Sequence, residues 1–259
     1  MDNQGLDVSI SPRRYAFDVR EATMRDFDDK NKAQLETTLA ELGKILAIEI
    51  FTVAKGGDLT TGARFASFAL SKSAVDILIS ALHMARQRAT METLVLLRVA
   101  LETGGTALHI SRDVSAYEQY KSGKYKSDNS IGCAKKEITN FGKIWGLLSD
   151  HAVHITELGY GPTLEQDEHG SLNPTISIQY SIIGGQPFDD HKLLSFISLV
   201  TAIVLKITEI TLFQQSHLGK PWLNLPGTQM EYFHNTDALI SKYLADITSI
   251  PETKAGEEE

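Results

Sequence analysis

The sequence predicts an all-α protein, folded as one multi-helix bundle with a small β-hairpin insertion around residues 163–182. Two observations support this prediction. Apolar residues recur every three or four positions through most of the chain, which is the period of an amphipathic helix. One short segment, residues 175–182, instead alternates polar and apolar side chains with a period of two, which is typical of a strand.

The stretches with the helical period are separated by glycine, proline or polar residues. They cover about residues 28–50, 60–87, 90–112, 133–158, 187–215 and 230–247, with a shorter helix over residues 115–120. The stretch 90–112 is apolar nearly all round, so we expect it in the middle of the bundle. In the first stretch, five apolar residues form the stripe that is expected to face the core: Leu35, Leu39, Leu42, Leu46 and Ile50.

Three local features of these stretches lead to further structural predictions. Gly104 and Gly105 lie inside a helix, where they are expected to permit the close approach of a neighbouring helix. His109 lies near a helix end, where a positive charge complements the helix macrodipole. Asp113 or Ser115 is expected to cap the short helix that follows.

The predicted hairpin pairs the strand at residues 175–182 with a partner near residues 163–166 and turns around His169 and Gly170. No internal repeat or composition break divides the chain, so we expect one domain over residues 1–259. Residues 1–25 and 250–259 are expected to be flexible, because chain ends are poorly ordered unless they are packed against the rest.

Composition and charge narrow the class of protein. The net charge of -8 disfavours a nucleic-acid partner, because phosphate binding needs clustered Lys and Arg, but it does not exclude a local basic patch. Cys133 is the only cysteine, so no intrachain disulfide can form, which suits a reducing compartment. The most apolar stretch, residues 193–213, contains Lys206 and Glu209, which favour a buried helix over a membrane span. With no secretory signal visible, we expect a cytoplasmic protein without membrane contact.

Arg98 and Glu102 are the first candidates for a functional site. They are four residues apart, so they share a face of the most apolar helix. An unpaired charge buried there would be strongly unfavourable. One interpretation is therefore an ion pair that fixes the helix register. The other is that Arg98 presents its guanidinium group to an anionic ligand, such as a phosphate, in a cleft between helices.

The segment 149–157 holds the second group of candidates. On a helix, His151, His154 and Glu157 could reach one side, and imidazole and carboxylate groups bind zinc or iron. The residue orders of known helical metal sites are absent, so we expect neither a metal nor a cofactor. Ser149 and His154 are residue types of hydrolytic triads, but no strand-turn-helix elbow surrounds them. His154 stays a candidate general acid or base near Arg98.

The layout of these candidates resembles a known pattern. Residues 97–102 (LRVALE), followed by residues 145–149 (WGLLS) and His154, are similar to uncharacterised bacterial helical-bundle proteins with an Arg-x-x-x-Glu and Ser-x-x-x-x-His layout. The likeness covers residues 60–160. It also distantly resembles HEPN-type helical domains, some of which are metal-independent ribonucleases with an Arg-x(4–6)-His motif. Here no Arg lies four to six residues before His154, which departs from the ribonuclease motif.

Two functions therefore stay open. The first is a non-enzymatic helical bundle that acts through protein–protein contacts as a homodimer, with Arg98 and Glu102 in structural roles. The second is an enzyme, such as a HEPN-like ribonuclease, or a ligand-binding protein, with a polar cleft in which Arg98, Glu102, Ser149 and His154 are the catalytic or binding residues. The sequence favours the first, because it contains no complete catalytic signature.

Overall fold

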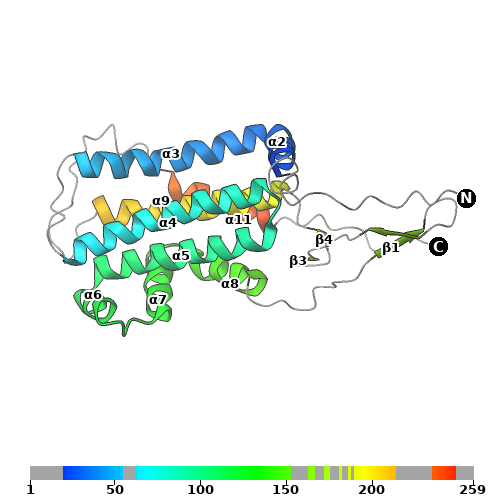
Figure 1. The fold of residues 1–259 in the computed structure, drawn as a ribbon. Helices are drawn as coiled ribbons and strands as arrows, with labels where there is room; N and C mark the ends of the chain where they lie inside the picture. Colours follow the sequence, from blue (N-terminus) through cyan, green and yellow to red (C-terminus); the bar gives the residue numbers. More distant parts are fainter. Residues whose placement is uncertain are drawn as a thin grey trace, which may run out of the picture.

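The computed structural model describes residues 20–54, 62–152, 163–166, 172–175, 181–182, 186–187, 190–213 and 235–248. The helices in these ranges are α2 (Arg20–Lys30), α3 (Lys32–Ala54), α4 (Gly62–Arg86), α5 (Thr90–Arg112), α6 (Val114–Lys121), α7 (Ser127–Glu137), α8 (Phe141–Ala152), α9 (Asp190–Phe213) and α11 (Thr236–Thr248). The long helices α3, α4, α5 and α9 lie side by side, and α6, α7 and α8 lie along α5 (Figure 1). The predicted all-α bundle is confirmed.

The centre of the bundle is shared by α5 and α9. Helix α5 packs against α4, α6, α7, α8 and α9, as its apolar sequence predicts. Helix α9 packs against α3, α4, α5 and α11, and its Ile197, Val200 and Val204 are completely buried. Helix α5 is less enclosed, because Val95 and Val99 remain exposed on its outer face. Of these two central helices, α9 is thus the more completely buried.

Gly104 of α5 permits close helix approach, as predicted for the glycine pair. A Cβ atom built on Gly104 would lie 3.0 Å from the Cδ1 atom of Ile207 in α9, which is tighter than an ordinary contact. A Cβ atom on Gly105 would lie 3.6 Å from Ser130 of α7, which is an ordinary van der Waals distance. Gly104 therefore lets α9 pack close to the backbone of α5, whereas the contact at Gly105 does not require a glycine.

The helix boundaries differ from the prediction in two regions of the chain. The first helix begins at Arg20, so residues 20–25, which were expected to be flexible, are helical, and α2 and α3 are separated at Asn31. The predicted helix over residues 133–158 is two helices, α7 and α8, and α7 begins earlier, at Ser127. Asn140 lies at their junction with a φ of 63°. Asn is one of the few residues that adopt this left-handed conformation readily, and the conformation ends a helix.

Helix α3 does not bury the stripe that its sequence predicts. Leu42 and Ile45 are buried, but Leu39 is 49% exposed and Ile50 is 69% exposed. The buried face of α3 also holds four polar residues: Thr38, Glu41, Glu49 and Thr52. Five apolar or small residues share its exposed side, and we call them the α3 outer stripe: Leu39, Ala40, Gly43, Ala47 and Ile50.

Hydrogen bonds to α9 explain this rotation of α3. The amide of Gln34 donates to the Ser195 hydroxyl at 3.0 Å, and the hydroxyls of Thr38 and Ser198 lie 2.7 Å apart. A buried hydroxyl without a partner is unfavourable, so these pairs hold the polar side of α3 against α9. Leu39 and Ile50 are turned outward as a consequence.

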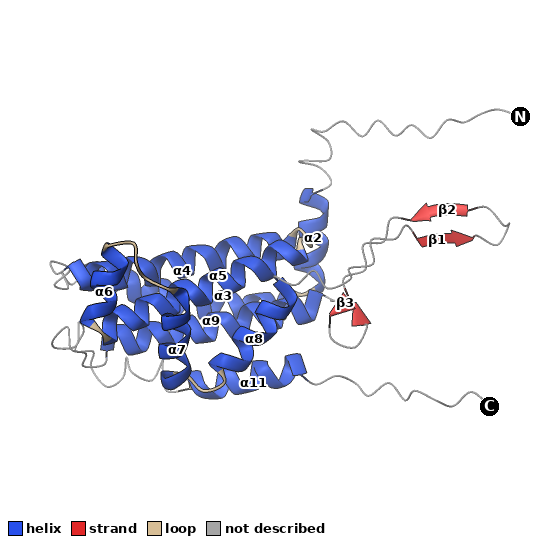
Figure 2. Cartoon of the chain, turned by 90° about the horizontal axis from the view of Figure 1, so that it is seen from below, coloured by secondary structure: helices blue, strands red, loops and turns tan. Residues whose placement is uncertain are grey.

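The described residues do not support the predicted hairpin insertion. Strand β1 (Thr163–Gln166) pairs antiparallel with β2 (Leu172–Thr175), and β3 (Ser181–Ile182) pairs with β4 (Gln186–Pro187). The partner of β1 is therefore not the predicted strand at residues 175–182, most of which lies outside the described residues. An isolated two-stranded ladder is marginal in water, and Pro174 in β2 has no N–H group to donate. The fold is described by its helices, which Figure 2 shows with α6 at one end of the bundle and α2 at the other.

Two helices are long and apolar enough to cross a membrane by length and composition alone. They are α4 and residues 190–211 of α9. In the most apolar 18 residues of the α9 segment 89% of the residues are buried, as expected for a core helix, whereas the share in α4 is 44%. The Lys206 ammonium in α9 lies 3.2 Å from Glu209 and 3.3 Å from Asp237 of α11, so its charge is paired. The expected absence of membrane contact and the cytoplasmic location stay predictions.

Candidate functional site

Arg98 and Glu102 form the pair that their spacing predicts. The Nη2 atom of Arg98 lies 3.7 Å from the Oε1 atom of Glu102, and their side chains are 27% and 30% exposed. At this distance the contact is an ion pair without a good hydrogen bond. The pair lies at the edge of the helix layer rather than deep in the core, because the outer face of α5 is partly open. Glu102 therefore holds the guanidinium group only loosely.

Trp145 of α8 is the second partner of Arg98. The guanidinium carbon lies 4.9 Å from the centre of the Trp145 ring, within the range of a cation–π contact. The Nε atom of Arg98 is buried and has no hydrogen-bond partner in the described part of the chain. The Trp145 ring thus fixes the plane of the guanidinium group, and the N–H group at Nε of Arg98 has no acceptor in the described part of the chain. In the sequence Trp145 entered only through the family resemblance, because no spacing rule connects it to Arg98.

Ser149 lies one turn after Trp145 on α8, the helix that packs against α5. Its Oγ atom is buried without a hydrogen-bond partner among the described residues. His154 and Glu157 lie outside the described residues, and for His151 only the helical backbone is described. The structure therefore brings Arg98, Glu102 and the helix of Ser149 together. Among the described residues, no group of three His, Cys, Asp or Glu side chains is arranged to hold a metal ion.

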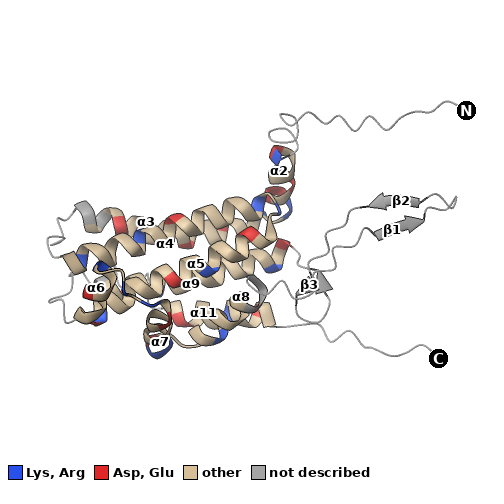
Figure 3. Ribbon diagram, turned by 60° about the horizontal axis from the view of Figure 1, so that its bottom comes forward, with Lys and Arg blue, Asp and Glu red and all other residues tan. Residues whose placement is uncertain are grey.

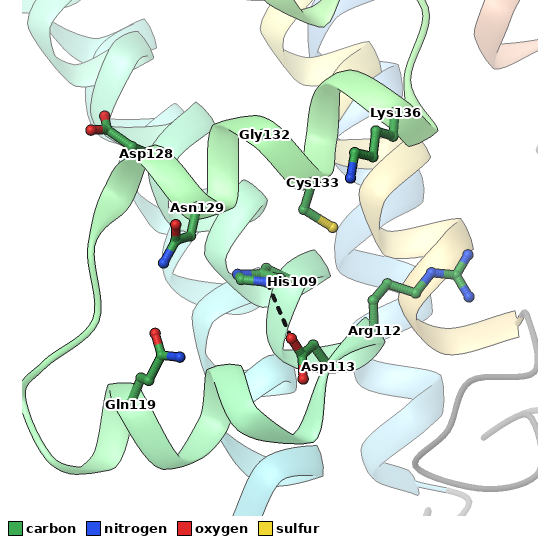
Figure 4. Close-up of a pocket in the computed structure, with 9 residues that line it drawn as sticks. All are labelled: His109, Arg112, Asp113, Gln119, Asp128, Asn129, Gly132, Cys133 and Lys136. Carbon is green, nitrogen blue, oxygen red and sulfur yellow. Dashed lines mark ion pairs between the residues drawn. The ribbon is translucent and has the colours of Figure 1, made fainter.

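A separate polar pocket of about 530 Å³ lies between the end of α5 and the helices α6 and α7 (Figure 4). His109 of α5 and Cys133 of α7 face this pocket. Gln119 of α6 and Asn129 of α7 line its other side. Asp113, between α5 and α6, caps α6 by accepting a hydrogen bond from the Ser115 amide at 2.8 Å, which confirms the predicted cap. The pocket is thus formed where three helices meet.

His109 is held in the pocket by Tyr125. Its Nδ1 atom lies 2.8 Å from the Tyr125 hydroxyl, and its Nε2 atom lies 3.9 Å from the Asp113 carboxylate. Burial lowers the pKa of His109, so the neutral ring is favoured. Burial raises the pKa of Tyr125 to about 12, so its phenol keeps a proton that it can donate to Nδ1. In that arrangement Nε2 carries the imidazole proton.

Cys133 and His109 are the residue types of a cysteine nucleophile and its base, but the pocket does not activate the thiol. Burial raises the pKa of Cys133, whereas a nucleophilic cysteine needs a lowered pKa. The Nδ1 atom of His109 is already hydrogen-bonded to Tyr125, and its Nε2 atom lies 3.9 Å from the Asp113 carboxylate. The arrangement can therefore bind a ligand through hydrogen bonds and charge, but it is not prepared for covalent catalysis. The sequence did not reveal this pocket, because His109 was interpreted as a charge at a helix end.

Comparisons with protein-family models, with curated proteins and with solved structures found no significant match to this chain. The predicted likeness to bacterial helical-bundle proteins and to HEPN-type domains therefore stays a prediction. The interpretation of both sites rests on their geometry and chemistry.

Proposed function

We propose that this chain is a homodimeric helical-bundle protein that acts through protein–protein contacts, and that the α3 outer stripe is its dimer face. The observation that carries the proposal is the orientation of α3. Its exposed side carries Leu39 and Ile50, whereas its buried side carries the carboxylates Glu41 and Glu49. A second protein surface on the stripe would remove these apolar side chains from water, which is favourable in proportion to the area covered.

Gly43, at the middle of the stripe, supports the same proposal. A glycine inside a helix costs about 1 kcal/mol relative to alanine. A Cβ atom on Gly43 would meet no other atom within 4 Å, so packing within the described chain does not require a glycine there. A second helix that crosses the stripe closely would require it. Ala47, one turn later, is the next small residue at the same crossing.

The stripe is complementary to a second copy of itself. If two α3 helices cross antiparallel, Gly43 faces the partner's Ala47 and Leu39 lies near the partner's Ile50. Small residues then meet at the crossing point, and large apolar residues meet on both sides of it. Such a contact obeys twofold symmetry, in which each copy uses the same surface. Lys44, which follows Gly43, lies 2.8 Å from Glu41 of its own helix, so its charge is already paired.

Light scattering on the full chain over a range of concentrations tests the dimer. We expect a mass of twice 28.6 kDa for the wild-type chain. Ala47→Arg places a charge at the centre of the stripe and should give a monomer with an unchanged helical circular dichroism spectrum. Thr37→Arg is the matched control, because Thr37 is exposed on the same helix but off the stripe. A wild-type monomer at every concentration, or equal dissociation in both variants, would contradict the proposal.

A second candidate function is favoured by the seam between α5 and α8. Arg98 Nε and Ser149 Oγ are both buried without a hydrogen-bond partner in the described part of the chain. Buried polar groups are nearly always hydrogen-bonded, so both atoms have a hydrogen bond to offer to a ligand group or to a water molecule. A guanidinium group that stacks on Trp145 and pairs loosely with Glu102 suits a carboxylate or phosphate. Ribonuclease activity of the HEPN type would also need His154 at this place, which stays a prediction.

Thermal unfolding in inorganic phosphate tests this second candidate. Phosphate stabilises proteins in general, so the comparison is between variants at matched ionic strength. We expect phosphate to raise the Tm of the wild-type chain more than that of Arg98→Met. Arg25→Met, at an exposed arginine of α2, should respond like the wild type. Equal shifts in all three proteins would show that Arg98 does not bind the anion.

The expected absence of a nucleic-acid partner stays a prediction. Figure 3 shows Lys and Arg interspersed with Asp and Glu along the helices in that view, rather than gathered into one basic face. Binding to a nucleic-acid backbone needs several phosphate contacts from clustered cations. The charge distribution of the described helices therefore agrees with a protein or small-molecule partner.

A further inference from the structure

Neither proposed function uses the pocket between α5, α6 and α7. We propose that it binds a small zwitterion of the free amino-acid class. The pocket involves neither the α3 outer stripe nor the Arg98 pair, so this inference stands independently of the proposed function. Its volume of about 530 Å³ lies within the range of small-molecule sites.

The residues that line the pocket favour a polar ligand. Apart from one glycine, every residue that lines it carries a charged or polar side chain or a thiol, and none carries an aliphatic or phenyl side chain. Pockets for most cofactors and drug-like molecules are lined predominantly by apolar side chains. A ligand here must instead replace the hydrogen bonds of water with hydrogen bonds to these side chains.

Two cations and two anions line the pocket, which favours a ligand that carries both a positive and a negative charge. Arg112 and Lys136 are the cations, and Asp113 and Asp128 are the anions. A polyanion such as a nucleotide phosphate would meet the two carboxylates, and a polycation would meet the two cations. Arg112 is also paired with Glu137 at 3.3 Å, so Lys136 is the cation that can turn to a ligand. A molecule with one carboxylate and one ammonium group fits this arrangement best.

The positions of the groups suggest how an amino acid would lie. Figure 4 shows Lys136 and Asp113 on opposite sides of Cys133 and His109. Lys136 would bind the ligand carboxylate, and Asp113 would bind its ammonium group. His109 lies next to Asp113. Its Nε2 atom is 3.9 Å from that carboxylate, which leaves room for a hydrogen bond from Nε2 to the ligand.

Two carboxamides would then contact the side chain of the ligand. Gln119 and Asn129 approach the pocket from α6 and α7 (Figure 4). Each carboxamide offers both donors and an acceptor, so a polar side chain that also has both would be matched. L-glutamine is therefore a better probe than L-leucine, which would leave the carboxamides unpaired.

Isothermal titration calorimetry on the full chain, with L-glutamine as the probe, tests the proposal. We expect saturable binding of L-glutamine. N-acetyl-L-glutamine, which lacks the ammonium group, and L-leucine should both bind more weakly. Removing one of the two charged side chains that bind the ligand, Lys136 or Asp113, should weaken binding of L-glutamine by about fivefold. The absence of saturable L-glutamine binding, or equal binding of the N-acetyl derivative, would overturn the proposal.

Matched variants locate the binding. Lys136→Met removes the cation, and Asp113→Asn removes the anion while keeping an oxygen that can cap α6. Both should weaken L-glutamine binding, and both should keep the wild-type circular dichroism spectrum. Lys135→Met is the control, because Lys135 is also exposed on α7 but does not line the pocket. Wild-type binding in the two pocket variants would show that glutamine binds elsewhere, and would overturn the assignment.

Discussion

Glu49 carries a carboxylate that the fold takes out of water. It is 6% exposed, and one of its oxygens has no hydrogen-bond partner in the described part of the chain. Burial raises its pKa to about 7; the positive charge of Lys72 opposes this shift and the negative charge of Asp76 adds to it. The folded state therefore holds a proton that the unfolded state releases at lower pH. The stability from this group is complete below about pH 4.5 and is lost as the pH rises through 7.

Glu49→Gln should therefore stabilise the protein in a pH-dependent way. Glutamine is uncharged at every pH, so the variant avoids the cost of ionising a buried carboxylate. We expect a gain of about 1–3 kcal/mol at pH 8 and a much smaller difference at pH 5. Urea unfolding at both pH values, at one protein concentration, measures this. The same difference at both pH values would show that ionisation of Glu49 is not the cause.

His109 should show the opposite pH dependence. Burial lowers its pKa, so the folded state favours the neutral ring. Its contribution to stability is present above the ordinary pKa of 6.5 and is lost as the pH falls below that value. A titration of the His109 ring protons by NMR should therefore give a midpoint below 6.5. A midpoint at or above 6.5 would contradict the buried, Tyr125-bound ring.

At the scale of residues, sequence reasoning finds contacts within one helix and misses contacts between helices. The Arg98–Glu102 pair follows from the spacing of four residues, which puts both side chains on one face. Trp145 reaches Arg98 from another helix, and local spacing gives no sign of that contact. The pocket between α5, α6 and α7 is missed for the same reason, because His109, Gln119 and Asn129 come from three separate helices.

At the scale of elements, helix α3 shows how tertiary contacts override an apolar pattern. Its sequence has apolar residues on two sides, so the period alone does not determine which side faces the core. The bonds from Gln34 and Thr38 to serines of α9 make that choice. The boundaries of α4 and α5 were predicted closely, because no proline lies inside either helix. The junction of α7 and α8 was missed, because the apolar period continues across Asn140.

The contact between α5 and α9 predicts a contrast between two glycines. In Gly104→Leu, the new side chain would meet Ile207 of α9, because even a Cβ atom there would lie 3.0 Å from its Cδ1 atom. Overpacking of this kind costs about 1–3 kcal/mol. Gly146→Leu in α8 is the control, because a Cβ atom there meets nothing within 4 Å, and the change should instead add about 1 kcal/mol of helix propensity. Chemical denaturation of both variants measures the contrast. Equal stability would mean that α5 and α9 do not pack this closely.

At the scale of the whole molecule, the buried apolar residues explain the helical bundle. The apolar residues that stay exposed on α3 support the proposed homodimer. The all-α class was predictable because the helical period runs through most of the chain. The predicted hairpin insertion is not supported, because most of the strand at residues 175–182 lies outside the described residues, and an alternating segment alone does not identify its partner strand. The proposed homodimer rests on α3, which buries the carboxylates of Glu41 and Glu49 and exposes Leu39 and Ile50.

Oxidative cross-linking through the α3 outer stripe tests the homodimer most directly. In a Cys133→Ser background, the chain has no other cysteine, so Gly43→Cys and Ala47→Cys each place a single thiol at the proposed crossing point. Two thiols can be bridged only if their Cα atoms come within about 7 Å. Because Gly43 faces the partner's Ala47, we predict a covalent dimer when Gly43→Cys and Ala47→Cys chains are mixed. We predict none when Thr37→Cys, which lies off the stripe, replaces either chain. A mixture of Gly43→Cys and Ala47→Cys chains that stays monomeric under oxidation, or a Thr37→Cys mixture that cross-links equally well, would contradict the homodimer.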